Sequence, residues 1–353
     1  MARTTVYNDD ITREWDGYDD EAGNHIEVLA ENKDLHDRFI RYCKANDRSP
    51  QTIFQYGHWI RVFMCWNCRE NGNKPFVDCD INDFMDYIAY LRDRDMSPRR
   101  INSLKAGISS LSNYIQRTMR AQYPTFRNQV RDMEPIKSVA VREKTVLSTE
   151  QVDAILNKLV ELGEYQLACY LSLICASGAR KGEIIQMKAS FFGDKAKTVF
   201  DGYMYKTPKV RAKGSGKLGK PLEKFVIKPM FDPYLRLWLE ERERLGVDCD
   251  HLFVRRSGGK WVPATISTAN SFARKLSVYS DEDFYSHSGR HYFCTMLKSM
   301  DLPDDVIMEI FGWSSNMIPV YDDTPAEERL KKFFKGFGER MRKEGEDGGE
   351  GNE

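Results

Sequence analysis

The sequence predicts a mainly α-helical chain of two domains, the second of which contains a small antiparallel β-sheet. Its 353 residues are enough for two domains of ordinary size, and a hydrophobic fraction of 41% is enough to build their cores. Four apolar stripes at helical spacing lie in the first part of the chain. A glycine-rich segment between two apolar runs in the second part is typical of a β-hairpin.

Charge is distributed unevenly along this chain. Residues 1–34 carry a net charge of −7 and residues 339–353 carry −3, which leaves +10 on residues 35–338 of a chain that is neutral as a whole. A positive body is compatible with a phosphate-binding surface. We expect residues 1–34 to form an acidic, mobile segment and residues 341–353 to form an acidic tail.

The first domain is expected at residues 35–135 as a bundle of four helices. The first helix begins near Leu35, and the second and fourth begin at Ser49 and Ser97, where a capping serine precedes a proline. Asp80 with Asp83 opens the third helix. The exposed bases that begin with the fourth helix either follow a nucleic-acid backbone or form a solvated helix face, and they include Arg99, Arg100 and Lys105.

Residues 136–147 lack a core pattern and are expected to be the linker to a second domain at residues 148–340. Ser148 and Gln151 have capping-box spacing after the apolar Leu147, so a helix should begin there. The apolar run from residue 168 to 174 predicts a buried helix that ends at Gly178. Arg180 then opens another helix, where its charge adds to the affinity of a helix amino terminus for phosphate.

Residues 195–228 contain ten lysines and arginines against two acids. Glycines 214, 216 and 219 separate an aromatic strand at about residues 199–205 from a second strand at about residues 224–227. This pattern predicts a hairpin with a mobile, basic tip that approaches a nucleic-acid groove or phosphate. The bases that we expect to make such contacts are Lys209, Arg211 and Lys217.

The segment from Ser286 to Tyr321 concentrates side chains suited to phosphodiester chemistry. On a helix, His287 shares a face with Arg290 and His291. A guanidinium matches two phosphate oxygens, and an imidazole donates to a third oxygen or moves a proton. The indole of Trp313 adds an N–H donor.

Three separated motifs, followed by a tyrosine, together resemble the catalytic domain of the tyrosine recombinase (phage integrase) family. They are Ser-Gly-Ala-Arg-Lys-Gly-Glu at residues 177–183, His-x-x-Arg-His at 287–291 and Gly-Trp-Ser-Ser at 312–315. The interval from Arg290 to Trp313 also matches the family's spacing. The resemblance covers residues 148–340 and, by architecture, residues 35–135, where the family has a helical core-binding domain that clamps DNA.

This resemblance implies a site-specific DNA recombinase that works through a 3′-phosphotyrosine intermediate without a metal or nucleotide cofactor. Arg180, His287, Arg290 and Trp313 would then bind the phosphate, Tyr321 would attack it, and Lys213 would protonate the leaving oxygen. Glu183 and His291 would support the arginines. The register of the hairpin leaves Lys209 and Lys217 as alternatives to Lys213.

Two departures from the family pattern affect this alignment. The interval from Trp313 to Tyr321 is one residue shorter than usual and contains Pro319, so Tyr285 and Tyr292 remain alternatives to Tyr321 as the nucleophile. Gly289 also stands where a larger apolar residue is common. Type IB topoisomerase-like relaxation of DNA, or DNA binding without cleavage, are the alternative functions.

The same resemblance implies a homo-tetramer on two double-stranded DNA sites, assisted by accessory DNA-bending or directionality factors. A helix that starts after Thr324, with an apolar stripe, would dock on a neighbouring protomer. We expect a soluble cytoplasmic protein, associated with the nucleoid and encoded by a host, a virus or a mobile element. No apolar run is long enough for a membrane span, and the amino terminus lacks a signal-peptide pattern.

The eight cysteines lie mostly in apolar helical patterns and predict free thiols in a reducing compartment. Cys65 and Cys68 have zinc-like spacing. They have no second pair at a suitable distance, so we expect them to pack in a core and predict no metal site.

Overall fold

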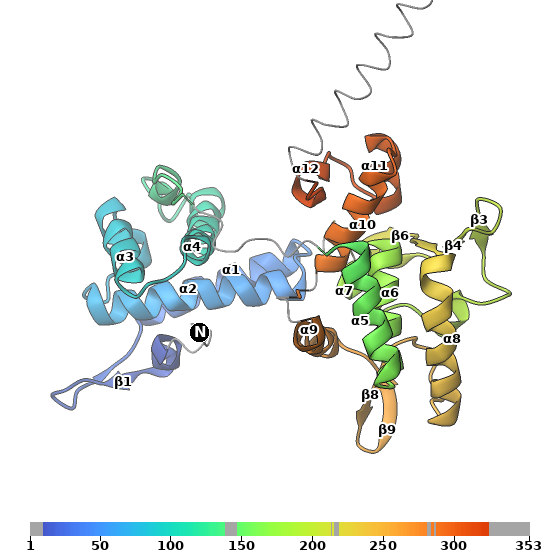
Figure 1. Cartoon of the computed structure of the whole chain (residues 1–353). Helices are drawn as coiled ribbons and strands as arrows, with labels where there is room; N and C mark the ends of the chain where they lie inside the picture. Colours follow the sequence, from blue (N-terminus) through green and yellow to red (C-terminus); the bar gives the residue numbers. More distant parts are fainter. Residues whose placement is uncertain are drawn as a thin grey trace, which may run out of the picture. The chain divides into compact units, whose positions relative to one another are not determined.

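Helices form most of the computed structural model, which describes residues 10–137, 147–212, 214, 219–280, 284–285 and 287–324 (Figure 1). The chain divides into two units at residues 143 and 144, a boundary inside the segment predicted as the linker. Each unit has a hydrophobic core of its own. None of the helices in these residues is long and apolar enough to cross a bilayer.

The first unit is a helical bundle. Its α-helices are α1 (Ala30–Ala45), α2 (Pro50–Glu70), α3 (Ile81–Asp93) and α4 (Pro98–Thr118). Shorter elements are the 3-10 helices η1 (Asp10–Asp16), η2 (Phe76–Asp78) and η3 (Gln129–Arg131) and the antiparallel strands β1 (Tyr18–Asp19) and β2 (His25–Ile26). The predicted bundle is confirmed, although α1 begins ahead of Leu35.

The helix starts follow the predicted caps. The side chains of Ser49 and Ser97 each accept a hydrogen bond from the backbone N–H three residues later, and a proline follows each serine. Asp80 and Asp83 form a reciprocal capping box at the start of α3. Each cap contributes about 1 kcal/mol, so these local features explain why the helices begin where the sequence predicted.

Aromatic side chains fill the centre of this bundle. The ring of Phe63, on α2, is fully buried and lies 5.6 Å from Phe76, 5.5 Å from Phe84 and 5.1 Å from Tyr87, measured between ring centroids. Full burial of one such side chain stabilises the fold by roughly 1.5–3 kcal/mol. Cys65 and Cys68 are buried in the same core, as expected for packing residues.

Residues 10–34 differ from the mobile acidic segment that the charge pattern predicted. Ile11 and Val28 are buried in the core of the first unit, and η1 packs on α2. Glu14 accepts a hydrogen bond from Arg69 at 2.9 Å. The few apolar residues in this stretch outweigh its net charge because their burial against α2 offsets the cost of ordering the chain. Residues 1–9 lie outside the described residues.

The second unit combines helices with short strands. Its α-helices are α5 (Thr149–Glu161), α6 (Tyr165–Ser177), α7 (Lys181–Ile184), α8 (Lys228–Arg244), α9 (Ile266–Ser280), α10 (Ser288–Ser299), α11 (Asp304–Phe311) and α12 (Ile318–Tyr321), with the 3-10 helix η4 (Ala189–Phe191). Its strands are β3 (Thr198–Val199), β4 (Met204–Lys206), β5 (Val210–Ala212), β6 (Lys220–Leu222), β7 (Phe225–Ile227), β8 (Val254–Ser257) and β9 (Lys260–Pro263).

Helix α6 is the centre of this unit, and residues 167–177 along it are buried without a break. It packs against α5, α8 and α10 (Figure 1). The buried run and its end at Gly178 were predicted, and both predictions are confirmed. The capping box of Ser148 and Gln151 at the start of α5 is confirmed as well.

The predicted aromatic strand at residues 199–205 is wrong as a single element. Phe200 and Asp201 have φ angles of 54° and 51°, and Gly202 has 83°, so the chain turns between β3 and β4. Two non-glycine residues in the left-handed region are uncommon, and the sequence offered no local reason to expect them. Strand β4 pairs with both β3 and β7, and β5 pairs separately with β6, all antiparallel.

The end of the described chain returns to α10 through two short helices. Helix α11 ends at Gly312, whose φ of 67° is left-handed. Pro319 stands in the first turn of α12, a position where its fixed φ and missing N–H cost nothing. This placement accounts for the proline in the interval between Trp313 and Tyr321. The predicted helix after Thr324 lies outside the described residues.

Candidate active site

Arg180 is set at the turn between α6 and α7. Gly178 ends α6 with a left-handed φ of 57°, and a Cβ at this position would lie 2.5 Å from Phe311 Cε1 and 2.7 Å from Phe293 Cδ1. Only glycine satisfies both the backbone conformation and this close approach. The turn therefore places Arg180 beside the helices that carry the other predicted site residues.

Glu183 fixes the position of Arg180 through hydrogen bonds. It is 1% exposed, and its carboxylate accepts hydrogen bonds from Arg180 N at 3.0 Å and from Arg180 Nη1 at 3.2 Å. Lys224 Nζ lies 2.8 Å from Glu183 Oε2. Burial by itself would raise the pKa of Glu183, but the charges of Lys224 and Arg180 more than offset burial, so its pKa lies below the usual value.

Arg290 lies on α10 and is completely buried. Its Nη1 donates to the Gly178 carbonyl at 2.5 Å, and its guanidinium carbon lies 4.5 to 5.2 Å from the ring centres of Phe311, Trp313 and Tyr321. Burial and the charge of Arg180 lower the pKa of Arg290 to about 10. The guanidinium therefore remains charged near neutral pH.

His287 immediately precedes α10. Burial lowers its pKa to about 4, and the nearby charges of Arg290 and Arg180 act in the same direction. The imidazole is therefore neutral near pH 7, able to donate from one ring nitrogen and accept at the other. Its ring lies 6.4 Å from the ring of Tyr321, measured between centroids.

Trp313 and Tyr321 continue a stack of rings that begins at Phe311. The centroid of Trp313 lies 4.3 Å from that of Phe311 and 5.3 Å from that of Tyr321, with interplanar angles of 14° and 22°. Such offset stacking contributes about 0.5–1.5 kcal/mol per pair beyond burial. The stack fixes the plane of the Tyr321 ring next to the guanidinium of Arg290.

Polar contacts hold the backbone after Tyr321 against α10. His291 Nδ1 lies 2.7 Å from Asp323 Oδ2, and both side chains are buried. Asp323 N donates to Thr295 Oγ1 at 3.1 Å. The His291 ring also lies 4.8 Å from that of Tyr321. His291 thus contacts the tyrosine and its flanking segment, whereas the sequence had assigned it to support of the arginines.

Four buried side-chain nitrogens of this cluster have no hydrogen-bond partner among the described residues. They are His287 Nδ1, Arg290 Nε, Arg290 Nη2 and Trp313 Nε1. A buried donor without an acceptor costs about 1–3 kcal/mol, so a folded chain rarely keeps several of them together without a ligand. Three are obligatory donors, and two of these belong to the single guanidinium cation of Arg290, which matches an anion with several oxygens, such as a phosphate.

Of the other predicted residues of the second unit, Tyr285 has its ring centroid 6.0 Å from that of His291. Lys213 and Lys217 lie outside the described residues, and Lys209 and Arg211 are exposed at β5. The alternative nucleophile Tyr292 is 5% exposed, and its hydroxyl pairs with Thr149 Oγ1 at 3.3 Å. Thr149 lies on α5, so the Tyr292 hydroxyl already has a partner there.

The bases predicted to follow DNA on α4 differ in how they are engaged. Arg99 is exposed, and Arg100 Nη2 lies 3.0 Å from His58 Nε2. Lys105 Nζ donates to the carbonyls of Met133 and Glu134 at 3.1 and 2.9 Å. Lys105 therefore already holds a loop of its own unit.

Sequence reasoning missed two residues of the site, Lys224 and Asp323. Lys224 was counted among the bases of the hairpin, although it immediately precedes the apolar Phe225-Val226-Ile227 and is therefore a poor candidate for a solvated tip. Asp323 follows the tyrosine by two residues. Neither pattern reveals the partner, which is far away in the sequence in both cases.

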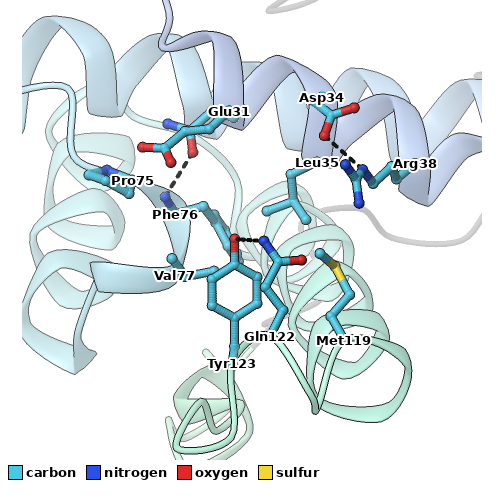
Figure 2. Close-up of a pocket in the computed structure, with 11 residues that line it drawn as sticks. Glu31, Asp34, Leu35, Arg38, Pro75, Phe76, Val77, Met119, Gln122 and Tyr123 are labelled. Carbon is cyan, nitrogen blue, oxygen red and sulfur yellow. Dashed lines mark hydrogen bonds and ion pairs between the residues drawn. The ribbon is translucent and has the colours of Figure 1, made fainter.

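A pocket of about 130 Å³ in the first unit lacks comparable chemistry. Figure 2 shows its lining from α1, from residues 75–77 and from the end of α4 and beyond. Asp34 pairs with Arg38, and Gln122 donates to Tyr123. These polar groups are therefore paired within the pocket, in contrast to the donors around Tyr321.

Comparisons with known proteins identify the family to which both units are similar. Residues 145–325 match the phage integrase family, and residues 35–121 match the N-terminal SAM-like domain of phage integrases. The SPbeta prophage-derived recombinase-like protein YomM of Bacillus subtilis (strain 168) is 30% identical over 250 residues, which cover 70% of this chain and 72% of YomM.

Solved structures show the same fold at low sequence identity. The Tn1549 transposon integrase in complex with circular intermediate DNA matches with a TM-score of 0.63 and 14% identity, over 86% of this chain and 98% of that one. A lambda integrase dimer bound to a core site matches with 0.59 and 15%, over 82% and 77%. The XerH recombinase bound to difH in a post-cleavage complex matches with 0.56 and 17%, over 87% and 97%.

Proposed function

The chain belongs to the phage integrase family of tyrosine recombinases, and we propose that it cleaves and rejoins double-stranded DNA through a covalent bond between Tyr321 and a 3′ phosphate. Family membership makes it a tyrosine-type site-specific recombinase. It argues against the topoisomerase-like and non-catalytic alternatives. The assignment of individual residues rests on the site described above.

The observation that carries this assignment is the set of unpartnered donors around Tyr321. A scissile phosphate seated among His287, Arg290 and Trp313 would supply acceptors for the four buried nitrogens. Arg180, held by Glu183, adds a second guanidinium. Donors arranged before the substrate arrives stabilise the charge that develops on the phosphoryl oxygens without a reorganisation cost.

The reaction then proceeds as a transesterification. The Tyr321 oxygen attacks phosphorus, the bond to the 5′ oxygen breaks, and a 3′-phosphotyrosyl bond replaces it. The neutral imidazole of His287 takes the phenolic proton, and Lys213 supplies a proton to the leaving 5′ oxygen. Because one phosphoester bond replaces another, a 5′ hydroxyl of a second strand reverses the step, and no cofactor is required.

The stoichiometry of strand exchange supports a homo-tetramer. Recombination between two duplexes breaks four strands, and each break needs a tyrosine of its own, so four protomers act on two DNA sites. Accessory DNA-bending or directionality factors, and association with the nucleoid, belong to the same proposal. In the assembled form, the chain that follows Thr324 docks on a neighbouring protomer.

A nicked suicide substrate that contains the element's own junction sequence tests the nucleophile. We expect the wild-type protein to form a covalent protein–DNA band on a denaturing gel. Tyr321→Phe removes only the hydroxyl, so this variant should bind the DNA and give no band. Tyr285→Phe and Tyr292→Phe are matched controls that should retain the band.

Each other outcome has a definite meaning. If the band persists in Tyr321→Phe and disappears in one of the control variants, the nucleophile has been misassigned. If the wild-type protein gives no band on DNA that it binds, the proposed cleavage activity is refuted.

A further inference from the structure

Lys224 is a lysine in a place where lysines are rare. It lies between β6 and β7 and is 1% exposed. Its backbone N donates to Thr207 Oγ1 at 3.0 Å, and its carbonyl accepts from Thr207 N at 2.9 Å. An ammonium group is almost never fully buried unless it is paired. The burial of Lys224 therefore points to a specific partner.

Its partner is the carboxylate that holds Arg180. Glu183 Oε2 lies 2.8 Å from Lys224 Nζ and 3.0 Å from Arg180 N, and Glu183 Oε1 accepts from Arg180 Nη1. Glu183 alone would cancel the charge of Arg180, because the two form a close ion pair. With Lys224 the trio carries a net charge of +1, so a positive charge remains at the turn.

The same lysine joins two parts of the site. Thr207 and Lys224 are hydrogen-bonded to each other. They lie between the strand pair β4–β7 and the strand pair β5–β6. Residues 213–219 connect β5 to β6 and include the candidate proton donor Lys213. A second link exists nearby, since the Gln186 side chain bonds Arg211 N and O at 3.0 Å each. Lys224 therefore ties the base of this hairpin to the turn that carries Arg180.

We propose that Lys224 is a positioning residue for DNA cleavage, which orients Arg180 through Glu183 and leaves the turn with a positive charge for the scissile phosphate. This inference rests on the proposed function. Lys224 does not act on the leaving group in this scheme, because its ammonium is buried against Glu183. A proton donor and a positioning residue respond differently to a change of leaving group, and this difference provides the test.

The experiment measures single-turnover cleavage of the suicide substrate at saturating protein. Lys224→Met removes the charge with little change in volume and should slow covalent-complex formation by about 100-fold, the effect expected when a phosphate-binding group is misplaced. Lys224→Arg keeps a cation at this place and should recover most of the rate. Lys206→Met is the matched control, since it breaks the half-exposed Lys206–Glu223 pair of the same sheet and should cleave like the wild type.

A second substrate, with sulfur in place of the 5′-bridging oxygen, separates the two roles. A thiolate leaves without a proton, so this substrate should restore cleavage by Lys213→Ala and should not restore cleavage by Lys224→Met. Restoration of Lys224→Met would make Lys224 the proton donor and overturn the inference. A wild-type cleavage rate in Lys224→Met would overturn it as well.

Folding is checked by circular dichroism. If Lys224→Met does not fold, the double variant Lys224→Met/Glu183→Gln, which leaves no unpaired buried charge, replaces it. Because Lys224 acts through Glu183 in this scheme, the double variant should cleave at the same slow rate as Glu183→Gln alone, and a markedly different rate refutes the inference. Absence of cleavage by the wild-type protein would instead refute the proposed function, so the two failures are distinguishable.

Discussion

Arg290 shows how the site stabilises a buried positive charge. A fully buried guanidinium loses its hydration, and in this protein a single carbonyl, that of Gly178, and the faces of three aromatic rings replace part of it. Cation–π contacts of a desolvated arginine contribute about 2 kcal/mol or more. Two of its nitrogens remain without partners among the described residues, so the arginine is held in place while its binding capacity stays available.

At His287 the same surroundings predict a dependence of stability on pH. Its pKa is about 4 in the folded protein against 6.5 for a free imidazole. Between these values the unfolded chain binds a proton and the folded chain does not, so the free energy of unfolding falls as pH is lowered through this window. His287→Gln should reduce this loss, as measured by urea unfolding at pH 7 and pH 5.

The control for this prediction is His251→Gln, a histidine of the same unit outside the donor cluster. It should lose stability with falling pH as the wild type does, because it leaves His287 in place. An equal loss in the wild type and in His287→Gln would show that His287 is not the group responsible.

Residues of the site differed in how far the sequence could predict them. Arg180, His287, Arg290, Trp313 and Tyr321 belong to local motifs, and the structure brings them together around one cluster of donors. Lys224 stands among ten lysines and arginines in residues 195–228, and only the fold shows that it is the buried one paired with Glu183. Long-range partners of this kind leave no pattern in a single sequence.

At the level of elements, α10 packs closely against α6. A Cβ on Gly289 would lie 2.3 Å from Ile174 Cγ2 and 3.4 Å from Cys175 Sγ. This contact explains why glycine stands where a larger apolar residue was expected. It brings the helix that carries Arg290 close to the helix that ends at the Arg180 turn.

Gly289→Ala should therefore destabilise the protein by about 1–3 kcal/mol, the usual cost of overpacking, although alanine is the better helix former. Gly182→Ala is the matched control, because the nearest atom to its Cβ would be Ile266 Cδ1 at 3.7 Å, and it should be neutral or slightly stabilising. Urea denaturation provides the measurement. A Gly289→Ala variant at least as stable as the wild type would contradict the proposed contact.

Elements were predictable where their limits are set locally. Capping residues such as Ser49, Asp80 and Ser148 satisfy backbone donors within one turn, so the sequence contains the whole cause of the helix start. The turn at Phe200 and the packing of residues 10–34 on α2 depend on contacts outside their own segments. Propensity and charge therefore gave the wrong expectation for both.

For the whole molecule, the two units are built around separate cores. The core of the first contains Phe63 and that of the second contains Phe293, and each of these side chains is 0% exposed. The boundary was predictable because residues 136–147 offer no core pattern.

Separate cores predict separable unfolding in the full chain. Phe63→Ala should destabilise the first unit by about 3–5 kcal/mol and lower the temperature of one calorimetric transition while the other stays unchanged. Phe293→Ala should lower the other transition only. Units that fold independently respond independently, since a mutation changes the free energy of the cooperative unit to which it belongs. If either variant shifted a single common transition, the two units would have to be treated as one cooperative fold, and cleavage defects from distant mutations in the first unit would then follow from lost stability of the catalytic unit.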